Sequence, residues 1–167
     1  MESRVKLLGH PVHQMLIVFP LGLLATSVIF DLVFLANRET EMAVAAYWTQ
    51  AAGLIGGLCA APFGLLDWMR IPVHTRARRV GAVHGIGNAI VMLLFLCSWL
   101  LRGDPSHIPP ALALLLSFSG AALAFVTGWL GGELVVRHGI GVHNNAGLDA
   151  PSSLHDPRHD ARVRHQP

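Results

Sequence analysis

Charged residues are scarce in this sequence. Asp, Glu, Lys and Arg make up only 13% of the 167 residues, whereas 53% are hydrophobic. A soluble domain of ordinary composition carries about twice that share of charge. The composition therefore excludes an ordinary water-soluble domain and predicts a chain that is embedded in a membrane.

Cysteines and aromatic residues are also few. Cys59 and Cys97 are the two cysteines, and both lie inside apolar runs, so a buried apolar role is expected rather than a disulfide or a cysteine-based metal site. The long Leu, Ala and Val runs and the seventeen glycines are typical of closely packed membrane helices. A β-barrel would show shorter segments of alternating polarity.

Several functional signatures are missing. The chain has no phosphate-binding glycine loop, no nucleophile with a nearby base and no cysteine-based zinc spacing. Its arginines occur in loops and in the tail rather than on one basic helical face, so nucleic acid is not an expected partner. Nothing in the sequence requires an independent enzyme.

Four apolar runs dominate what is present. They cover about 14–36, 43–68, 81–101 and 111–136, and each is long enough to cross a hydrocarbon core of about 30 Å as a helix. The expected fold is all-α: an integral membrane four-helix up-down bundle in one domain, 1–145. The Pro, Ser, His, Asp and Arg mixture of 146–167 predicts a disordered cytoplasmic tail.

Basic residues are distributed unequally between the two ends of the predicted bundle. Arg38 and Arg102 flank one end. The other end carries Arg4, Lys6, Arg70, Arg76, Arg78, Arg79 and Arg137. The excess of basic residues in cytoplasmic loops of membrane proteins predicts that both termini are cytoplasmic and that the apolar surface contacts lipid.

Histidines gather at the more basic end. An up-down bundle places the start of the first and third spans and the end of the second and fourth on one membrane face. That face carries four candidate ligands, His10, His13, His84 and His138. Asp67, Glu133 and Arg137 lie at a similar depth and are candidates to orient a ligand histidine. Alternatively, Glu133 and Arg137 form an ion pair one helical turn apart.

Neutral imidazole binds haem iron and other transition metals, and facing helices of a bundle commonly supply such ligands. The leading interpretation is a haem b bound by His84 and by His13 or His10, with His138 as a replacement ligand or a partner of a haem propionate. The first alternative is a non-haem metal site, in which the four histidines, His13 and His84 among them, bind zinc, iron or copper together with Glu133 or Asp67. Solvated histidines at the membrane interface remain the second.

Asp31 lies in the first span, 18 residues after His13. Five helical turns, about 27 Å, separate the two residues, so Asp31 is expected on the same face near the opposite surface. Either it serves as a proton or cation port, or it pairs with polar groups near Tyr47, Trp48 or Gln50.

Four stretches together resemble a bacterial membrane family, the domain of unknown function 2231. They are GHPVHQMLIVFPLGLL, GLLDW, RARRVGAVHGIGN and GWLGGELVVRHGIGV, and the resemblance extends to about Val142. It implies a four-span protein of the bacterial cytoplasmic (inner) membrane. Some similar proteins are joined to Rieske-type iron–sulfur domains, which implies electron transfer by association; this chain has no such domain.

The expected function is a small membrane redox subunit that binds haem b and transfers electrons between quinol and a protein partner. A second hypothesis is a metal-binding protein for sensing, storage or transport. A third is a cofactor-free scaffold whose small-residue helix faces serve packing and homo-oligomer formation.

Overall fold

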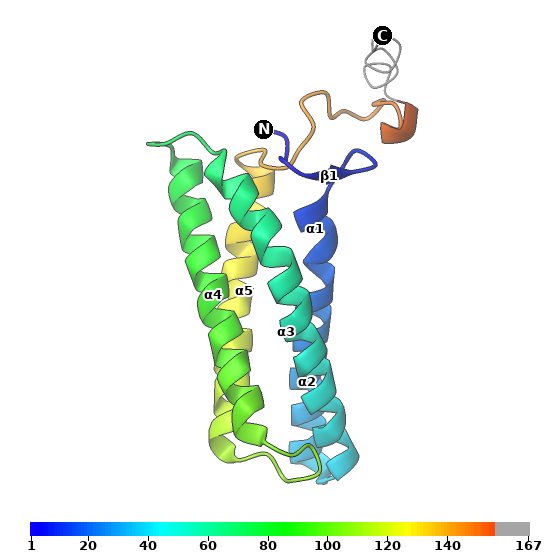
Figure 1. Ribbon diagram of the computed structural model, residues 1–167, viewed down its shortest axis with the longest axis vertical. Helices are drawn as coiled ribbons and strands as arrows, with labels where there is room; N and C mark the ends of the chain where they lie inside the picture. The colour runs from blue at the N-terminus through cyan, green and yellow to red at the C-terminus, as the bar shows by residue number, and fades with distance from the viewer. Residues whose placement is uncertain (156–167) are drawn as a thin grey trace.

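Four long helices form an up-down bundle in the computed structural model, which describes residues 1–155 (Figure 1). This confirms the all-α, four-span fold. The elements are β1 Lys6–Leu7, β2 His10–Pro11, α1 Val12–Leu16, α2 Val18–Asn37, α3 Thr40–Met69, α4 Arg76–Arg102, α5 Ala111–Val136 and the 3₁₀ turn η1 Ser153–His155. Of the predicted tail, 156–167 lies outside the described residues, and 146–155 contains turns and η1.

The first span consists of two helical segments, α1 and α2, that meet at Ile17. Pro20 lies in the first turn of α2, where its missing N–H leaves the carbonyl of Leu16 without its usual helical partner. The backbone bonds from Ile17 N to His13 O and from Leu21 N to Ile17 O, both 3.1 Å, keep the two segments in line. Together they form a candidate span of 26 residues.

The third span extends beyond its apolar run. Helix α4 begins at Arg76, because the Thr75 hydroxyl accepts a hydrogen bond from Arg78 N at 3.2 Å and caps the helix. The Arg78 guanidinium then turns back to the end of α3, where it donates to Ile71 O at 2.7 Å and lies over the Trp68 ring. This contact holds the loop between α3 and α4 against the bundle.

The four spans lie at the corners of a square in cross-section, and each packs against two neighbouring spans. Helix α2 contacts α3 and α5, and α4 contacts α3 and α5 (Figure 1). The first and third spans are therefore diagonal to each other, as are the second and fourth. This is the arrangement that short connections between antiparallel neighbours produce.

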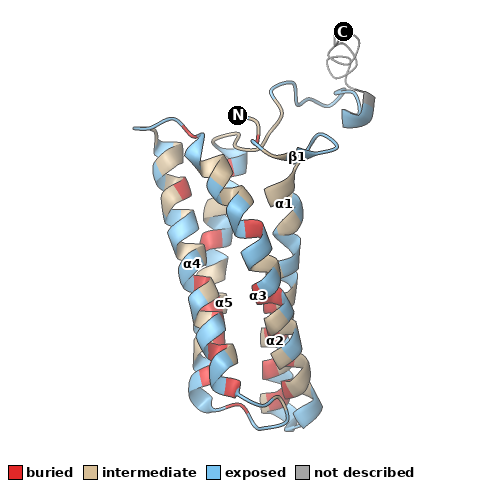
Figure 2. Cartoon of the chain, in the orientation of Figure 1, coloured by how far each residue is buried: buried red, intermediate tan, exposed pale blue. Residues whose placement is uncertain are grey.

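The distribution of polar and apolar side chains is the reverse of that in a water-soluble bundle: many large apolar side chains are on the outside and several polar ones are in the interior. Large apolar side chains such as Leu58, Phe125 and Ile86 are 69%, 83% and 63% exposed, whereas Asp31 and Gln50 are completely buried (Figure 2). An apolar exterior along four helices of at least 26 residues fits a hydrocarbon solvent. Lipid contact along the helices follows directly from this surface.

A short N-terminal hairpin, β1 and β2, covers one end of the bundle (Figure 1). Its turn contains Leu8 and Gly9, both at positive φ. The segment before it is anchored to other elements: the Met1 ammonium donates to Gly139 O at 2.7 Å, and the Ser3 hydroxyl lies 2.6 and 2.7 Å from the two carboxylate oxygens of Asp67. The hairpin was not anticipated from the sequence.

Candidate functional site

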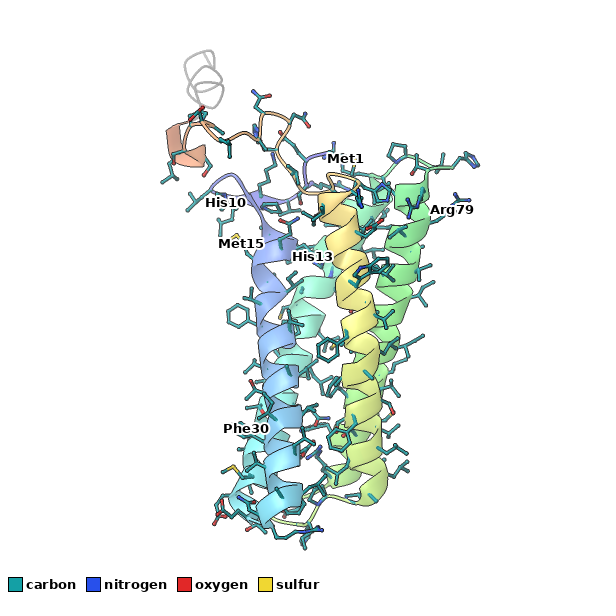
Figure 3. The ribbon with its side chains drawn as sticks, turned by 180° about the vertical axis from the view of Figure 1, so that it is seen from behind. Met1, His10, His13, Met15, Phe30 and Arg79 are labelled. Atoms are coloured by element: carbon teal, nitrogen blue, oxygen red, sulfur yellow. The ribbon has the colours of Figure 1, made fainter. Side chains whose placement is uncertain are left out.

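His13 lies in α1, at the end of the bundle that carries the N-terminus, and further into the bundle than His10 (Figure 3). Its side chain is half-buried against α3. Its Nδ1 lies 3.0 Å from the carbonyl oxygen of Ala60. The ring lies directly over Gly64, where an added Cβ would come within 2.6 Å of His13 Cε1.

His84 repeats these contacts on the other two helices. It lies in the third turn of α4, and its Nδ1 is 2.9 Å from the carbonyl oxygen of Thr127 in α5. A Cβ added at Gly131 would lie 3.0 Å from His84 Cε1. The Asn88 amide nitrogen is 3.1 Å from His84 Nε2, and Asn88 Oδ1 accepts a hydrogen bond from Thr127 Oγ1 at 3.0 Å. We call His13, His84, Asn88 and Thr127 the histidine layer.

Hydrogen bonding decides the tautomer of both rings. A carbonyl oxygen can only accept, so Nδ1 of His13 and of His84 must carry a proton. In the neutral ring the lone pair is then on Nε2, the atom that coordinates a metal when a carbonyl orients the other nitrogen. The two rings come from diagonal spans, His13 against α3 and His84 against α5.

The glycines around His84 serve packing in two of three cases. A Cβ at Gly81 would lie 2.7 Å from Trp68 Cδ1, and one at Gly87 would lie 2.5 Å from Thr127 Cγ2. At Gly85 nothing lies within 4 Å. Close helix approach therefore accounts for Gly81 and Gly87 without any ligand.

The other two histidine candidates lie apart from the histidine layer. His10 is exposed in the N-terminal hairpin, opposite Leu7. His138 follows α5, and its Nε2 is buried with no hydrogen-bond partner among residues 1–155. A buried ring nitrogen without a partner is costly, which makes His138 the second place at this end where a ligand is plausible.

The acidic and basic candidates have contacts of their own. Asp67 accepts from Ser3 and from Arg4 N, at 2.7 Å for the latter, so it anchors the N-terminal segment. Glu133 pairs with Arg76, at 3.4 Å, rather than with Arg137, which is exposed at the end of α5. Within residues 1–155, neither Asp67 nor Glu133 forms a hydrogen bond with His13 or His84.

A second polar cluster lies at the opposite end, around Asp31, whose partner Arg102 was missed by sequence reasoning. The side chain of Arg102 is 3% exposed and forms a bidentate ion pair with Asp31. The Nη1–Oδ1 distance is 2.8 Å and the Nη2–Oδ2 distance is 2.6 Å. Ser117 Oγ donates to Asp31 Oδ2 at 3.2 Å, and Gln50 Nε2 donates to Phe95 O at 2.6 Å. We call Asp31, Gln50, Arg102 and Ser117 the ion-pair layer.

Arg102 thus corrects the expectation that Asp31 pairs with groups near Tyr47, Trp48 or Gln50. The sequence placed Arg102 among the loop charges because it closes an apolar run. The available signal was its position: Arg102 follows His84 by the same number of residues as Asp31 follows His13.

Two histidines from diagonal helices, rather than a larger cluster, form the site in the described part of the chain. Nowhere within residues 1–155 do three or more His, Cys, Asp or Glu side chains come together as a metal-binding group. The family described as "Predicted membrane protein (DUF2231)" matches residues 9–144. The chain belongs to this family. No curated protein and no solved structure matches it.

Membership of DUF2231 agrees with the four membrane-capable helices and with the resemblance seen in the sequence motifs. The matched region includes the whole of both polar layers and ends before the tail. The family description specifies a membrane protein and no activity, so the functional argument rests on the histidine layer.

Proposed function

We propose that this DUF2231 protein is a membrane redox subunit that binds haem b between His13 and His84 and transfers electrons. One observation carries the proposal: two imidazoles on diagonal spans have the same Nδ1-to-carbonyl hydrogen bond, which leaves both Nε2 lone pairs for coordination. Haem would supply one-electron transfer when bound, and His13 and His84 are the residues that would hold it.

The residues present fit a group that needs two protein ligands. A zinc site uses three or four protein ligands, whereas a b-type haem needs two, and two is the number that converges here. Gly64 and Gly131 have no side chain, so each ring can pack directly against the backbone of the facing helix. Binding at His84 Nε2 requires the Asn88 amide to rotate away, and Thr127 Oγ1 remains available to Asn88 Oδ1.

Orientation and partners are part of the same proposal. Arg102 is an interior charge, so Arg38 alone flanks the far end, and the excess of basic residues at the histidine end becomes larger. We infer that this end faces the cytoplasm of a bacterial inner membrane, with both termini on that side. Quinol and a redox protein are the expected partners, and homo-oligomer formation through small-residue faces is compatible with them.

The decisive experiment is a visible spectrum of oxidised and dithionite-reduced protein, purified in detergent from haem-replete cells, with elemental analysis of the same sample. We expect a sharp reduced α-band that His13→Ala and His84→Ala each abolish. His10→Ala is the matched control, because that ring is exposed in the hairpin, and it should leave the band unchanged.

Two other results would point to other functions. A featureless spectrum with a stoichiometric transition metal would favour a metal-binding protein, and His138, with its unpartnered buried Nε2, would then be the next ligand to test. A featureless spectrum without metal would overturn both and leave the scaffold hypothesis.

A further inference from the structure

The contacts of the histidine layer recur at constant spacing along the chain. His13 contacts Ala60 O and Gly64; His84 contacts Thr127 O and Gly131. The two histidines are 71 positions apart, and both the carbonyl residues and the glycines are 67 positions apart. The first hairpin, α1–α3, thus repeats as the second, α4–α5.

The same two spacings reappear deeper in the bundle. A Cβ at Gly53 would lie 2.7 Å from Leu24 Cδ2, and one at Gly120 would lie 2.9 Å from Phe95 Cε2. Leu24 and Phe95 are 71 positions apart, and the two glycines are 67 apart. Both apolar residues belong to the buried core. This second contact lies about three helical turns from the first and has identical spacing. The repeat is therefore not limited to the histidines.

The ion-pair layer obeys the same rule. Asp31 and Arg102 are separated by 71 positions and bond to each other. Gln50 and Ser117 are 67 positions apart, and both are completely buried. Two equivalent positions can touch only where they lie beside the axis that relates them.

Helix directions and contacts define that axis. The first and third spans run in the same direction, and the contacts of α3 with α4 and of α2 with α5 are exchanged by the same rotation (Figure 1). We propose that the chain is a duplicated helical hairpin with a two-fold axis along the bundle, and that this axis passes through one ligand site between His13 and His84 and through the Asp31–Arg102 pair. Parallel repeats with an axis along the membrane normal are known among membrane proteins.

The axis also predicts the surroundings of the ion pair. Ser117 donates to Asp31, so its equivalent, Gln50, is predicted to lie beside Arg102. Gln50 Oε1, an acceptor, and Arg102 Nε, a donor, are both buried without a hydrogen-bond partner among the described residues. The axis predicts that this acceptor and this donor are neighbours, as Ser117 and Asp31 are.

Exchange of residues across the axis tests the duplication without reference to any cofactor. Asp31→Arg and Arg102→Asp each place two like charges in the layer, and each should abolish a monodisperse folded peak in detergent chromatography. The double exchange D31R/R102D should restore the peak. Adding Gln50→Ser and Ser117→Gln makes the layer the two-fold image of the natural one, and this quadruple variant should unfold within a few degrees of the natural protein.

Simple charge compensation predicts something different from the two-fold axis. If only charge mattered, the double and quadruple variants would have the same unfolding midpoint; the axis predicts that the quadruple variant is higher, by roughly 5 °C for one restored buried hydrogen bond. A double variant that fails to fold, or a quadruple variant no better than the double, would overturn the duplication.

The ligand part of the inference rests on the proposed function. One site on the axis predicts one haem per chain, and His13→Ala or His84→Ala should each remove all of it. Half of the haem remaining in either variant would overturn the shared site while leaving haem binding intact. A natural protein without haem would overturn the proposed function and the ligand site, but the exchange experiment would still decide the duplication.

Discussion

The two polar layers of this bundle differ in what their ionisable side chains bond to. In the ion-pair layer, Asp31 and Arg102 are almost fully buried and bond to each other through two hydrogen bonds. In the histidine layer, His13 and His84 are half-buried and bond to backbone carbonyls rather than to each other. A buried charge pair with two hydrogen bonds joins helices, whereas a neutral imidazole with its lone pair on Nε2 is suited to bind something else once, at His84, the Asn88 amide moves away.

Breaking the ion-pair layer should have the largest effect on stability. Asp31→Asn keeps the size of the side chain but leaves the Arg102 charge uncompensated, at a cost of about 3–5 kcal/mol. The unfolding midpoint in detergent measures this loss. The control is Asp31→Leu with Arg102→Leu, which removes both charges and should recover most of the stability. Equal stability of Asp31→Asn and the natural protein would show that the pair does not join the helices.

Filling the space beside one ring should have the next largest effect. The Cβ of Gly64→Ala would lie 2.6 Å from His13 Cε1, and displacing the ring should cost about 1–3 kcal/mol. Gly131→Ala, at 3.0 Å from His84 Cε1, should cost less. Gly132→Ala is the control, because nothing lies within 4 Å of its Cβ. A loss of stability in the control as large as that of Gly64→Ala would contradict the packing argument.

Removing a ring of the histidine layer should cost little stability. His84→Ala loses the hydrogen bonds to Thr127 and Asn88, together about 1–2 kcal/mol. Thermal unfolding of ligand-free protein measures this cost, and the visible spectrum separately measures binding. A stability loss equal to that of Asp31→Asn would remove the distinction between a binding layer and a structural layer.

The smallest effect concerns the N-terminal segment that covers the histidine end. The hydrogen bond from Lys6 and that from Asn144 N hold the pKa of Glu2 below its ordinary value of 4.5. A lowered carboxyl pKa contributes stability above the ordinary pKa and loses it as the pH falls through the lowered value. Protection of residues 1–6 from hydrogen exchange, corrected for intrinsic rate, should therefore fall below pH 4.5, and Glu2→Gln should abolish this pH dependence.

Sequence reasoning succeeded where a local property decides the structure. Runs of about 20 apolar residues become membrane helices because the hydrocarbon core leaves the backbone no other partner, so all four spans were predictable. The depth of His13 and His84 followed from the alternating direction of the spans. The Ser3–Asp67 contact was not predictable, because it joins residues 64 positions apart through side chains with no periodic pattern. The N-terminal hairpin was not predictable either, because its two strands are only two residues long and show no alternation of polarity.

The number, order and approximate extent of the helices, and the presence of histidines at one end, follow from the sequence. Which polar residues meet depends on the packing of the helices: Arg102 with Asp31 instead of a loop, Glu133 with Arg76 instead of Arg137. The physical reason is the distance along the chain over which each effect acts. Transfer into the membrane depends on the residues of one span, whereas pairing depends on the rotation of each helix about its own axis, and close packing of side chains from two or more helices sets that rotation.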